Sequence, residues 1–395
     1  MLFTLEALEA QNGDCLILHY GLPNRPRFIV IDGGPKGVYE GSLKPRLAAL
    51  KHKWSPNEVL PIEMVMVSHL DSDHIRGVLD WTEDLLQERL ATGGLSFDLL
   101  TLWHNSFDDI VGKDQDGLVA SLVATTQSPA GRRKKPGSLK LADHTELMLA
   151  SVGESRELRN NAEELDIVVN PGFERLVMAT MSGKKTVDWG DGLKFTIISP
   201  QAKRLANLQK EWDLKIEDLR KRGKLNTAEA SAEAAAYTDN SVYNLSSIVV
   251  LAECAGKRIL LTGDARGDDI LTGLANAGLL TNGKIRVDVL KLPHHGSQRD
   301  IAPEFFQSVL ADQYVISANG RDGNPDNETL RLLSVARGSD KFTLNLTNQT
   351  GKEGVGPRLR TFFAAEKKQK KKYAVVFRED SQLSVKVDLL EPITY

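Results

Sequence analysis

The chain has 395 residues, of which 41% are hydrophobic and 26% are charged, and its formal net charge is −3. This length exceeds one ordinary core, and the composition is that of a globular enzyme, which excludes the disordered and fibrous classes. The charge gives no overall attraction to nucleic acid, and the two cysteines, Cys15 and Cys254, are too few for a disulfide framework or a four-thiolate zinc site.

Two targeting features are missing from the sequence. No segment approaches the roughly 18 to 20 apolar residues that a membrane span requires. The first residues, MLFTLEALEAQNGD, lack the basic region and the long apolar run of a secretory signal. We therefore expect a cytoplasmic protein without a membrane association.

The first part of the chain alternates short apolar segments with turn signals and helical patterns. The predicted helices are 43–54 and 75–90, and the predicted strands are 3–8, 15–20, 27–32, 62–69 and 98–106. The second part repeats this order. It has predicted helices at 268–278 and around 326–335, and predicted strands at 193–200, 246–253, 257–264, 287–295, 313–320 and 341–348. Strands that lead into helices in both halves predict two sheets packed face to face with helices outside.

Two regions interrupt this pattern. Residues 201–236 are charged, rich in alanine and helical in pattern, with Gly223 as a hinge, and we interpret them as an inserted helical arm or lid. Residues 346–395 contain a basic run at 367–372 and two closing strands. We assign residues 1–345 to one domain and 346–395 to a small C-terminal β extension of it.

The densest group of metal-ligating side chains lies in SHLDSDHIRG, residues 68–77, directly after a predicted buried strand. Two histidines and two aspartates so close together are costly to desolvate unless a cation binds them. His69 and Asp71 alternate on one side of an extended turn and can reach one ion, while Asp73 and His74 can face a second. A helix N-terminus capped by Ser72 or Asp73 is the alternative, and it leaves both histidines unexplained.

Two later strands end in residues of the same kind. RILLTGD places Asp264 after an apolar strand, where its carboxylate oxygens can bridge two cations, although strand-Gly-Asp turns are common. VDVLKLPHHGS ends in His294 and His295, of which one can complete the metal site and the other can contact the substrate or donate a proton to the leaving group. The sequence leaves open which histidine does which. The predicted catalytic residues are Asp73, His294 and His295.

Charge counting favours a pair of divalent ions. Asp71, Asp73 and Asp264 would bring three negative charges into a small volume, and they cannot all stay ionised without compensation. Two divalent cations and one bridging hydroxide balance them, and such a pair generates hydroxide near neutral pH.

Five segments in order resemble the metallo-β-lactamase superfamily: GDC at 13–15, IDGG at 31–34, SHLDSDH at 68–74, LLTGD at 260–264 and LPHHGS at 292–297. They are most similar to the metallo-hydrolase domain of ComEC-type DNA-uptake competence proteins and its standalone relatives, over residues 4–345. The resemblance implies an α/β fold, an αββα sandwich of two mixed sheets flanked by helices, with a dinuclear metal site on its edge. It also implies that Asp32 and Asp14 support the metal ligands from behind.

Two departures from the superfamily pattern concern the metal. The commonest signature is His-x-His-x-Asp-His, and Asp71 replaces its second histidine, as in the ComEC-type domains. The added oxygen ligand shifts preference from zinc toward manganese or magnesium. The histidine usual before the strand that leads to Asp264 is replaced by Asn244, a weaker ligand. We expect two divalent ions, manganese or zinc, with magnesium as the alternative.

Phosphodiester hydrolysis, as a nuclease acting on DNA or RNA, is the preferred hypothesis, because hard cations activate water and neutralise the charge that develops on phosphorus. The basic runs 131–135 and 367–372 are either solvated charge or a rim of phosphate contacts. The residues predicted to contact substrate are His104, Asn105, Ser297, Lys134 and Lys135, with core packing as the alternative for the first two.

Two other functions stay open. The superfamily also hosts hydrolysis of lactones, thioesters and amides, so the fold does not decide the bond. The chain could instead be a degenerate scaffold that binds partners through residues 201–236. The resemblance to some standalone relatives adds protein partners encoded in the same operon as an expectation.

Overall fold

The computed structural model describes residues 1–111, 139–180, 182–206, 246–349, 355–369 and 371–395, together with positions 210, 214, 217 and 221. Three predicted site residues, Asn244, Lys134 and Lys135, lie outside these residues, as does most of the predicted arm at 201–236. Their predicted roles stay predictions.

The first sheet of the described chain has seven strands in the order β17-β1-β2-β3-β5-β7-β8. The strands from β17 to β3 are antiparallel neighbours, and those from β3 to β8 run parallel. The sheet is therefore mixed. Its strands are β17 (Ser384–Asp388), β1 (Leu2–Leu8), β2 (Leu16–Leu22), β3 (Arg25–Ile31), β5 (Met64–Val67), β7 (Thr101–His104) and β8 (Val168–Val169).

The second sheet has eight strands in the described chain, in the order β16-β15-β14-β13-β12-β11-β10-β9. Strands β16 to β12 run parallel, and β12 to β9 are antiparallel neighbours, so this sheet is mixed as well. Its strands are β16 (Ala374–Phe377), β15 (Thr343–Leu346), β14 (Val309–Ile316), β13 (Ile285–Lys291), β12 (Lys257–Leu261), β11 (Val249–Cys254), β10 (Leu193–Ser199) and β9 (Lys185–Gly190). A small parallel pair joins β4 (Leu60–Ile62) to β6 (Phe97–Leu99).

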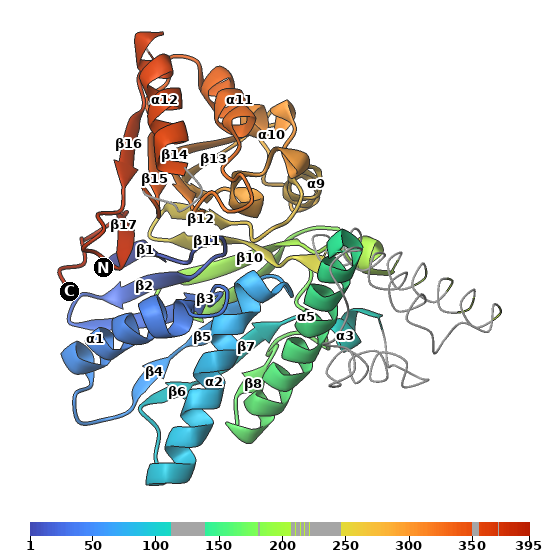
Figure 1. Cartoon of the computed structure of the whole chain (residues 1–395), viewed down its shortest axis with the longest axis vertical. Coiled ribbons are helices and arrows are strands. Elements are labelled where there is room, and N and C mark those ends of the chain that lie inside the picture. The colour runs from blue at the N-terminus through green and yellow to red at the C-terminus, as the bar shows by residue number, and fades with distance from the viewer. Residues whose placement is uncertain are drawn as a thin grey trace.

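Helices cover the outer face of each sheet (Figure 1). The first sheet packs against α1 (Lys44–Trp54), α2 (Ser72–Thr92) and α5 (Leu139–Glu164). The second sheet packs against α9 (Gly267–Asn276), α10 (Pro303–Ser308), α11 (Asn327–Arg337) and α12 (Val355–Lys368). The shorter helices are η1 (Tyr39–Leu43), α3 (Phe107–Val111), η2 (Pro293–Gly296) and η3 (Gln298–Asp300).

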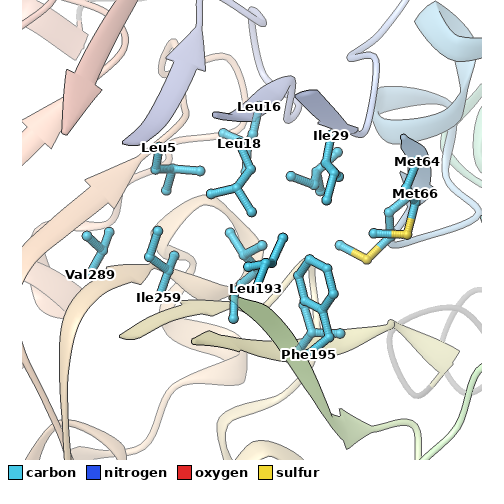
Figure 2. Packing of buried hydrophobic residues seen from close by; sticks show 14 of the residues in the cluster. Leu5, Leu16, Leu18, Ile29, Met64, Met66, Leu193, Phe195, Ile259 and Val289 are labelled. Atoms are coloured by element: carbon cyan, nitrogen blue, oxygen red, sulfur yellow. The ribbon is translucent and has the colours of Figure 1, made fainter. Parts of the chain in front are cut away.

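The main core lies between the two sheets. Figure 2 shows Leu5, Leu16, Leu18 and other side chains of the first sheet pointing toward Leu193, Phe195, Ile259 and Val289 of the second. Successive side chains of a strand point to opposite faces, so Leu16 and Leu18 of β2 enter this core while Ile17 packs against the helices. Each such aliphatic side chain contributes about 1.5–3 kcal/mol when it is fully buried. Burial on both faces explains why the strands are nearly continuous apolar runs.

The predicted αββα sandwich is confirmed. Residues 346–395 supply one edge strand to each sheet, because β16 pairs with β15 and β17 pairs with β1. Val385 and Val387 of β17 enter the core between the sheets. The boundary predicted at residue 345 falls inside β15, so the predicted C-terminal extension is an integral part of the sandwich.

Candidate metal centre

Four acidic and histidine side chains from distant segments meet at one edge of the sandwich. Asp14 lies between β1 and β2, His74 lies in the first turn of α2 after β5, Asp264 follows β12, and His295 follows β13. Each side chain offers one ligand atom, and these atoms lie within 4.8 Å of one another. All four residues are buried. The ends of β5, β12 and β13 thus deliver this group, as open α/β sheets commonly do.

Glycines let the loops of the site approach one another. A Cβ atom on Gly13 would lie 1.9 Å from the carbonyl oxygen of Asp73, and one on Gly33 would lie 2.3 Å from the backbone nitrogen of Val78. The Gly13 contact allows the backbone amide of Asp14 to donate a hydrogen bond of 3.3 Å to the Asp73 carbonyl. The GDC and IDGG motifs therefore bring Asp14 and Asp32 against the start of α2.

Asp264 lies between the two histidines of the group. Its Oδ1 is 3.2 Å from Nε2 of His74, and its Oδ2 is 3.4 Å from Nε2 of His295. Asp73 lies at the rim of the group, with its carboxylate oxygens 3.8 Å from Nε2 of His74 and 3.7 Å from Nε2 of His295. The side chain of Asp73 is 24% exposed, so it alone of these carboxylates opens to solvent.

Hydrogen bonds at Nδ1 fix both histidine rings. Nδ1 of His74 lies 3.0 Å from Oδ2 of Asp32, and Nδ1 of His295 lies 3.0 Å from the carbonyl oxygen of Ser317. Both oxygens accept hydrogen bonds, so each Nδ1 carries a proton and donates it. In the neutral ring Nε2 is then the lone-pair nitrogen, which is the usual arrangement of a metal-binding histidine.

Asp32 is held as firmly as the ring that it orients. Its Oδ1 accepts a 2.7 Å bond from the backbone amide of Ser68, and its Oδ2 accepts a 2.5 Å bond from the Ser68 hydroxyl as well as the bond from His74. Asp32 is 1% exposed and is not among the four residues that could hold an ion. Asp32 therefore contacts the His74 ring from outside the group, and its predicted supporting role stays a prediction.

The side chains of the group fit a divalent ion. Nε2 of His74, Nε2 of His295 and Oδ1 of Asp264 are buried and lack a hydrogen-bond partner of suitable geometry among the described residues. Three such atoms facing one another are costly to desolvate unless a cation binds them. Neutral imidazole and carboxylate together form the donor set of zinc and of harder divalent metals.

The pKa values of the group show which charges a bound cation would balance. Burial by itself would lower the pKa of both histidines. Asp264, Asp32 and Asp73 nevertheless raise the pKa of His74 well above its usual value, and Asp264 and Asp14 raise that of His295 to about 10. Burial opposes ionisation of Asp264, but His295, His74 and His294 hold the pKa of this carboxyl well below its usual range. Without an ion, protons on the histidines therefore compensate the carboxylates, and a bound ion displaces them.

Two predicted ligands lie beside the group and are not part of it. His69 is buried, and its ring centroid is 5.2 Å from that of His74. Burial lowers the pKa of His69 to about 3, so its ring is neutral, the form that binds metals. The Asp71 side chain is 37% exposed, and its Oδ2 lies 3.6 Å from Nδ1 of His69. The ligand roles of His69 and Asp71 stay predictions.

His294 and His295 take different positions. His294 is 28% exposed, its Nε2 lies 3.7 Å from Oδ2 of Asp264, and its Nδ1 contacts Oδ2 of Asp300. Both histidines have positive φ angles, 46° and 55°, and the His295 side chain is only 3% exposed. His295 therefore belongs to the buried group, and His294 faces its accessible side. The sequence left this assignment open, and it did not indicate Asp300.

The sequence also failed to indicate Lys291. This lysine ends β13, is 1% exposed, and forms an ion pair with Oδ2 of Asp14. The only signal was a lysine inside an otherwise apolar strand, and lysine is rarely buried without a charged partner. Asp14 was predicted to stand behind the ligands, and in the structure it is one of the four side chains of the group and contacts Lys291.

Three residues predicted to contact substrate make contacts within the protein. His104 is fully buried with its Nε2 3.3 Å from the Ser155 hydroxyl, and Asn105 exchanges two 2.8 Å hydrogen bonds with the backbone of Val177. Ser297 is 6% exposed, and its hydroxyl accepts a hydrogen bond from the amide of Arg299. Burial of both side chains fits the packing alternative that the sequence left open for His104 and Asn105. The substrate contacts of these residues and of Ser297 stay predictions.

Comparison with known proteins gives a local sequence match. No family model matches the chain. The chain is 33% identical over 100 residues to ComE operon protein 3 of Bacillus subtilis (strain 168), a match that covers 24% of this chain and 12% of that protein. The predicted similarity to ComEC-type proteins is thereby confirmed for that segment, and the chain spans only a small part of this relative.

A solved structure resembles the chain over nearly its whole length. Zn²⁺-bound PqqB from Methylobacterium extorquens has a TM-score of 0.40 and 11% identity, with 96% of this chain and 88% of that chain covered. In the described part of the chain, no helix combines the length and the apolar character that crossing a bilayer requires.

Proposed function

We propose that the chain is a metal-dependent hydrolase of phosphodiester bonds in nucleic acids or nucleotides. The observation that carries this proposal is the buried group of His74, Asp264 and His295, whose facing atoms lack hydrogen-bond partners among the described residues. Asp73 lies at the open side of the same group. Manganese and zinc are the metals that this donor set suits best.

The residues of the chain divide the work at this centre. Nε2 of His74, Nε2 of His295 and the carboxylates of Asp264 and Asp73 would hold divalent ions. Such ions supply Lewis-acid chemistry, because they activate water as a nucleophile and neutralise the charge that develops on the phosphoryl oxygens. Asp32 keeps the His74 ring in the binding tautomer.

His294 is placed to transfer a proton. Asp300 contacts its Nδ1, so Nε2 is directed at the accessible side of Asp264. Burial would lower the pKa of His294, but Asp264 and Asp300 raise it. A proton delivered from Nε2 to the leaving oxygen would complete the cleavage of a phosphodiester.

Two features support phosphate over an uncharged substrate. Arg266 and Arg299 follow the turns that carry Asp264 and His294, and both are exposed, although the guanidinium of Arg266 pairs with Asp268. A guanidinium binds phosphate oxygens in pairs, so these side chains suit the flanking phosphates of a polyanion. The motif resemblance to a domain of DNA-uptake proteins points to the same substrate class.

Metal-loaded protein provides the test. The chain, loaded with Mn²⁺ or Zn²⁺, is incubated with single- and double-stranded DNA, RNA, cyclic dinucleotides, a lactone and a thioester. We expect metal-dependent cleavage of at least one phosphodiester. Cleavage of only the lactone or the thioester would overturn the substrate class, and no turnover of any substrate would overturn the enzyme assignment.

Asp264→Asn with Asp166→Asn as its matched control separates chemistry from general damage. Asp166 is 94% exposed and lies far from the group in the chain, so its substitution should leave activity unchanged. Asp264→Asn should abolish both cleavage and metal retention. Equal activity in the two variants would contradict the role of Asp264.

A further inference from the structure

Lys291 places a third kind of charge inside the metal centre. Its ammonium forms an ion pair with Oδ2 of Asp14, donates a 3.2 Å hydrogen bond to the carbonyl oxygen of Gly263, and lies 3.9 Å from Oδ1 of Asp264. The lysine and the two carboxylates are each 1–3% exposed. The ammonium therefore lies in the same enclosed space as the atoms that would hold an ion.

A buried ammonium must be compensated by nearby negative charge. Burial alone would lower the pKa of Lys291, but Asp14 and Asp264 more than offset this effect and raise it. The ion pair with Asp14 and the 3.9 Å distance to Asp264 therefore place a positive charge inside the site.

This cation changes the role of Asp14. One oxygen of Asp14 contacts the ammonium, and its other oxygen lies 3.4 Å from Nδ1 of His295, on the side of the ring away from Asp264. Oδ2 of Asp14 is thus taken by the ammonium, although distance alone would allow the residue to bind an ion. Asp14 is therefore the carboxylate that pairs with the lysine, whereas the carboxylate of Asp264 faces the histidines and stays open to a metal.

We propose that Lys291 is a built-in counter-cation that pairs with Asp14 in place of the metal and weakens divalent-ion binding by its own charge. The inference rests on the proposed metal centre. It predicts that a neutral replacement of the whole pair preserves the centre. Replacement of the lysine alone adds one uncompensated negative charge, so the centre should bind a divalent ion more tightly.

A double-mutant cycle tests this assignment. Mn²⁺ affinity is measured by titration calorimetry on metal-free wild type, Lys291→Met, Asp14→Asn and the double variant Asp14→Asn/Lys291→Met. We expect Lys291→Met to bind on the order of tenfold more tightly. Asp14→Asn leaves the ammonium unpaired and should bind more weakly, and the double variant should return close to the wild-type affinity. A double variant that binds as weakly as Asp14→Asn would overturn the proposal, because Asp14 would then be a ligand.

Thermal unfolding of the same metal-free proteins gives an independent reading. Removing one partner of a buried ion pair is strongly destabilising, whereas replacing both is often tolerated. Lys291→Met should therefore lower the Tm by several degrees, and the double variant should recover most of that loss. No recovery would refute the pairing. If the wild type bound no Mn²⁺ or Zn²⁺, the proposed function would fail, and the unfolding cycle would still decide whether Lys291 and Asp14 act as a pair.

Discussion

Asp32→Asn is the substitution whose effect follows most directly from the geometry of the site. The aspartate accepts three hydrogen bonds, two from Ser68 and one from Nδ1 of His74. An amide keeps one acceptor oxygen, which can still receive the Ser68 amide. Its NH₂ group would replace Oδ2 and would face Nδ1 of His74 with a second donor.

This conflict can be relieved only if His74 moves its proton from Nδ1 to Nε2. Nε2 is the atom that lies 3.2 Å from Asp264 and would bind the ion. Metal binding to the variant must therefore break a hydrogen bond and reverse the tautomer. A hydrogen bond to a charged group contributes about 1.5–3 kcal/mol, which corresponds to a roughly 10- to 150-fold loss of metal affinity. Substitutions of residues that orient metal-binding histidines typically cost about 10- to 100-fold, in agreement with this figure.

Competition with a chromogenic chelator measures this loss. Mn²⁺ and Zn²⁺ affinities are compared for wild type, Asp32→Asn and the exposed control Asp166→Asn, with the thermal unfolding of each protein as a check on folding. We expect the control to match wild type. An Asp32→Asn protein that folds and binds metal as tightly as wild type would refute the argument that Asp32 sets the tautomer of His74.

Three further predictions concern the core, a glycine and the proton donor. Glu6 is fully buried, and burial would raise its pKa, but His19, Arg46 and Ser384 lower it from 4.5 to about 2. The ionised carboxylate therefore stabilises the fold above pH 4.5. This contribution, about 3 kcal/mol, is lost as the pH falls toward 2. Urea unfolding should show a lower free energy of unfolding for Glu6→Gln than for wild type at pH 7, and a smaller difference at pH 3. An equal difference at both pH values would contradict the pH-dependent stabilisation by the Glu6 carboxylate. Gly13→Ala must displace the backbone near Asp73. It should lower the free energy of unfolding by about 1–3 kcal/mol and reduce metal retention. Unchanged stability and metal content would show that the loop adapts to the added methyl group. Asp300→Asn should lower kcat on the order of a hundredfold with little change in KM, and a change confined to KM would assign Asp300 to substrate binding.

The sequence predicted the architecture because strand and helix periodicities reflect burial. In β2, Leu16 and Leu18 point to the face that the core between the sheets covers, and Ile17 points to the face that the helices cover. This alternation follows from the two-residue period of a strand, which can be recognised in the sequence. The pairing of β17 with β1 was not predictable in the same way. Its register joins Thr4 to Asp388, and no local pattern specifies a partner so far along the chain.

The candidate site was predicted where chemistry is concentrated in short motifs. His74, Asp264 and His295 follow apolar strands, and the meeting of strand ends brings them together. Residues that act through one tertiary contact escaped prediction. Lys291 has an ordinary strand position, and only its contact with Asp14 shows that its charge belongs to the site.

Tertiary packing determines the surroundings of two further predicted residues. His104 and Asn105 end a strand in the same manner as the residues of the site, so the sequence placed them near the cleft. The structure encloses them beneath α5 and the segment at Val177, where Ser155 and backbone groups bond to their polar atoms. Whether a later segment of the chain covers the residues at a strand end depends on tertiary packing. Local sequence patterns carry no information about that packing.

Anomalous diffraction at the manganese edge from crystals of the Mn²⁺-loaded protein tests the central claim most directly. We expect a strong peak bounded by Nε2 of His74, Nε2 of His295 and the carboxylate of Asp264, and no peak there in Asp264→Asn crystals. Peaks elsewhere on the molecule, or an empty centre in fully loaded protein, would contradict it.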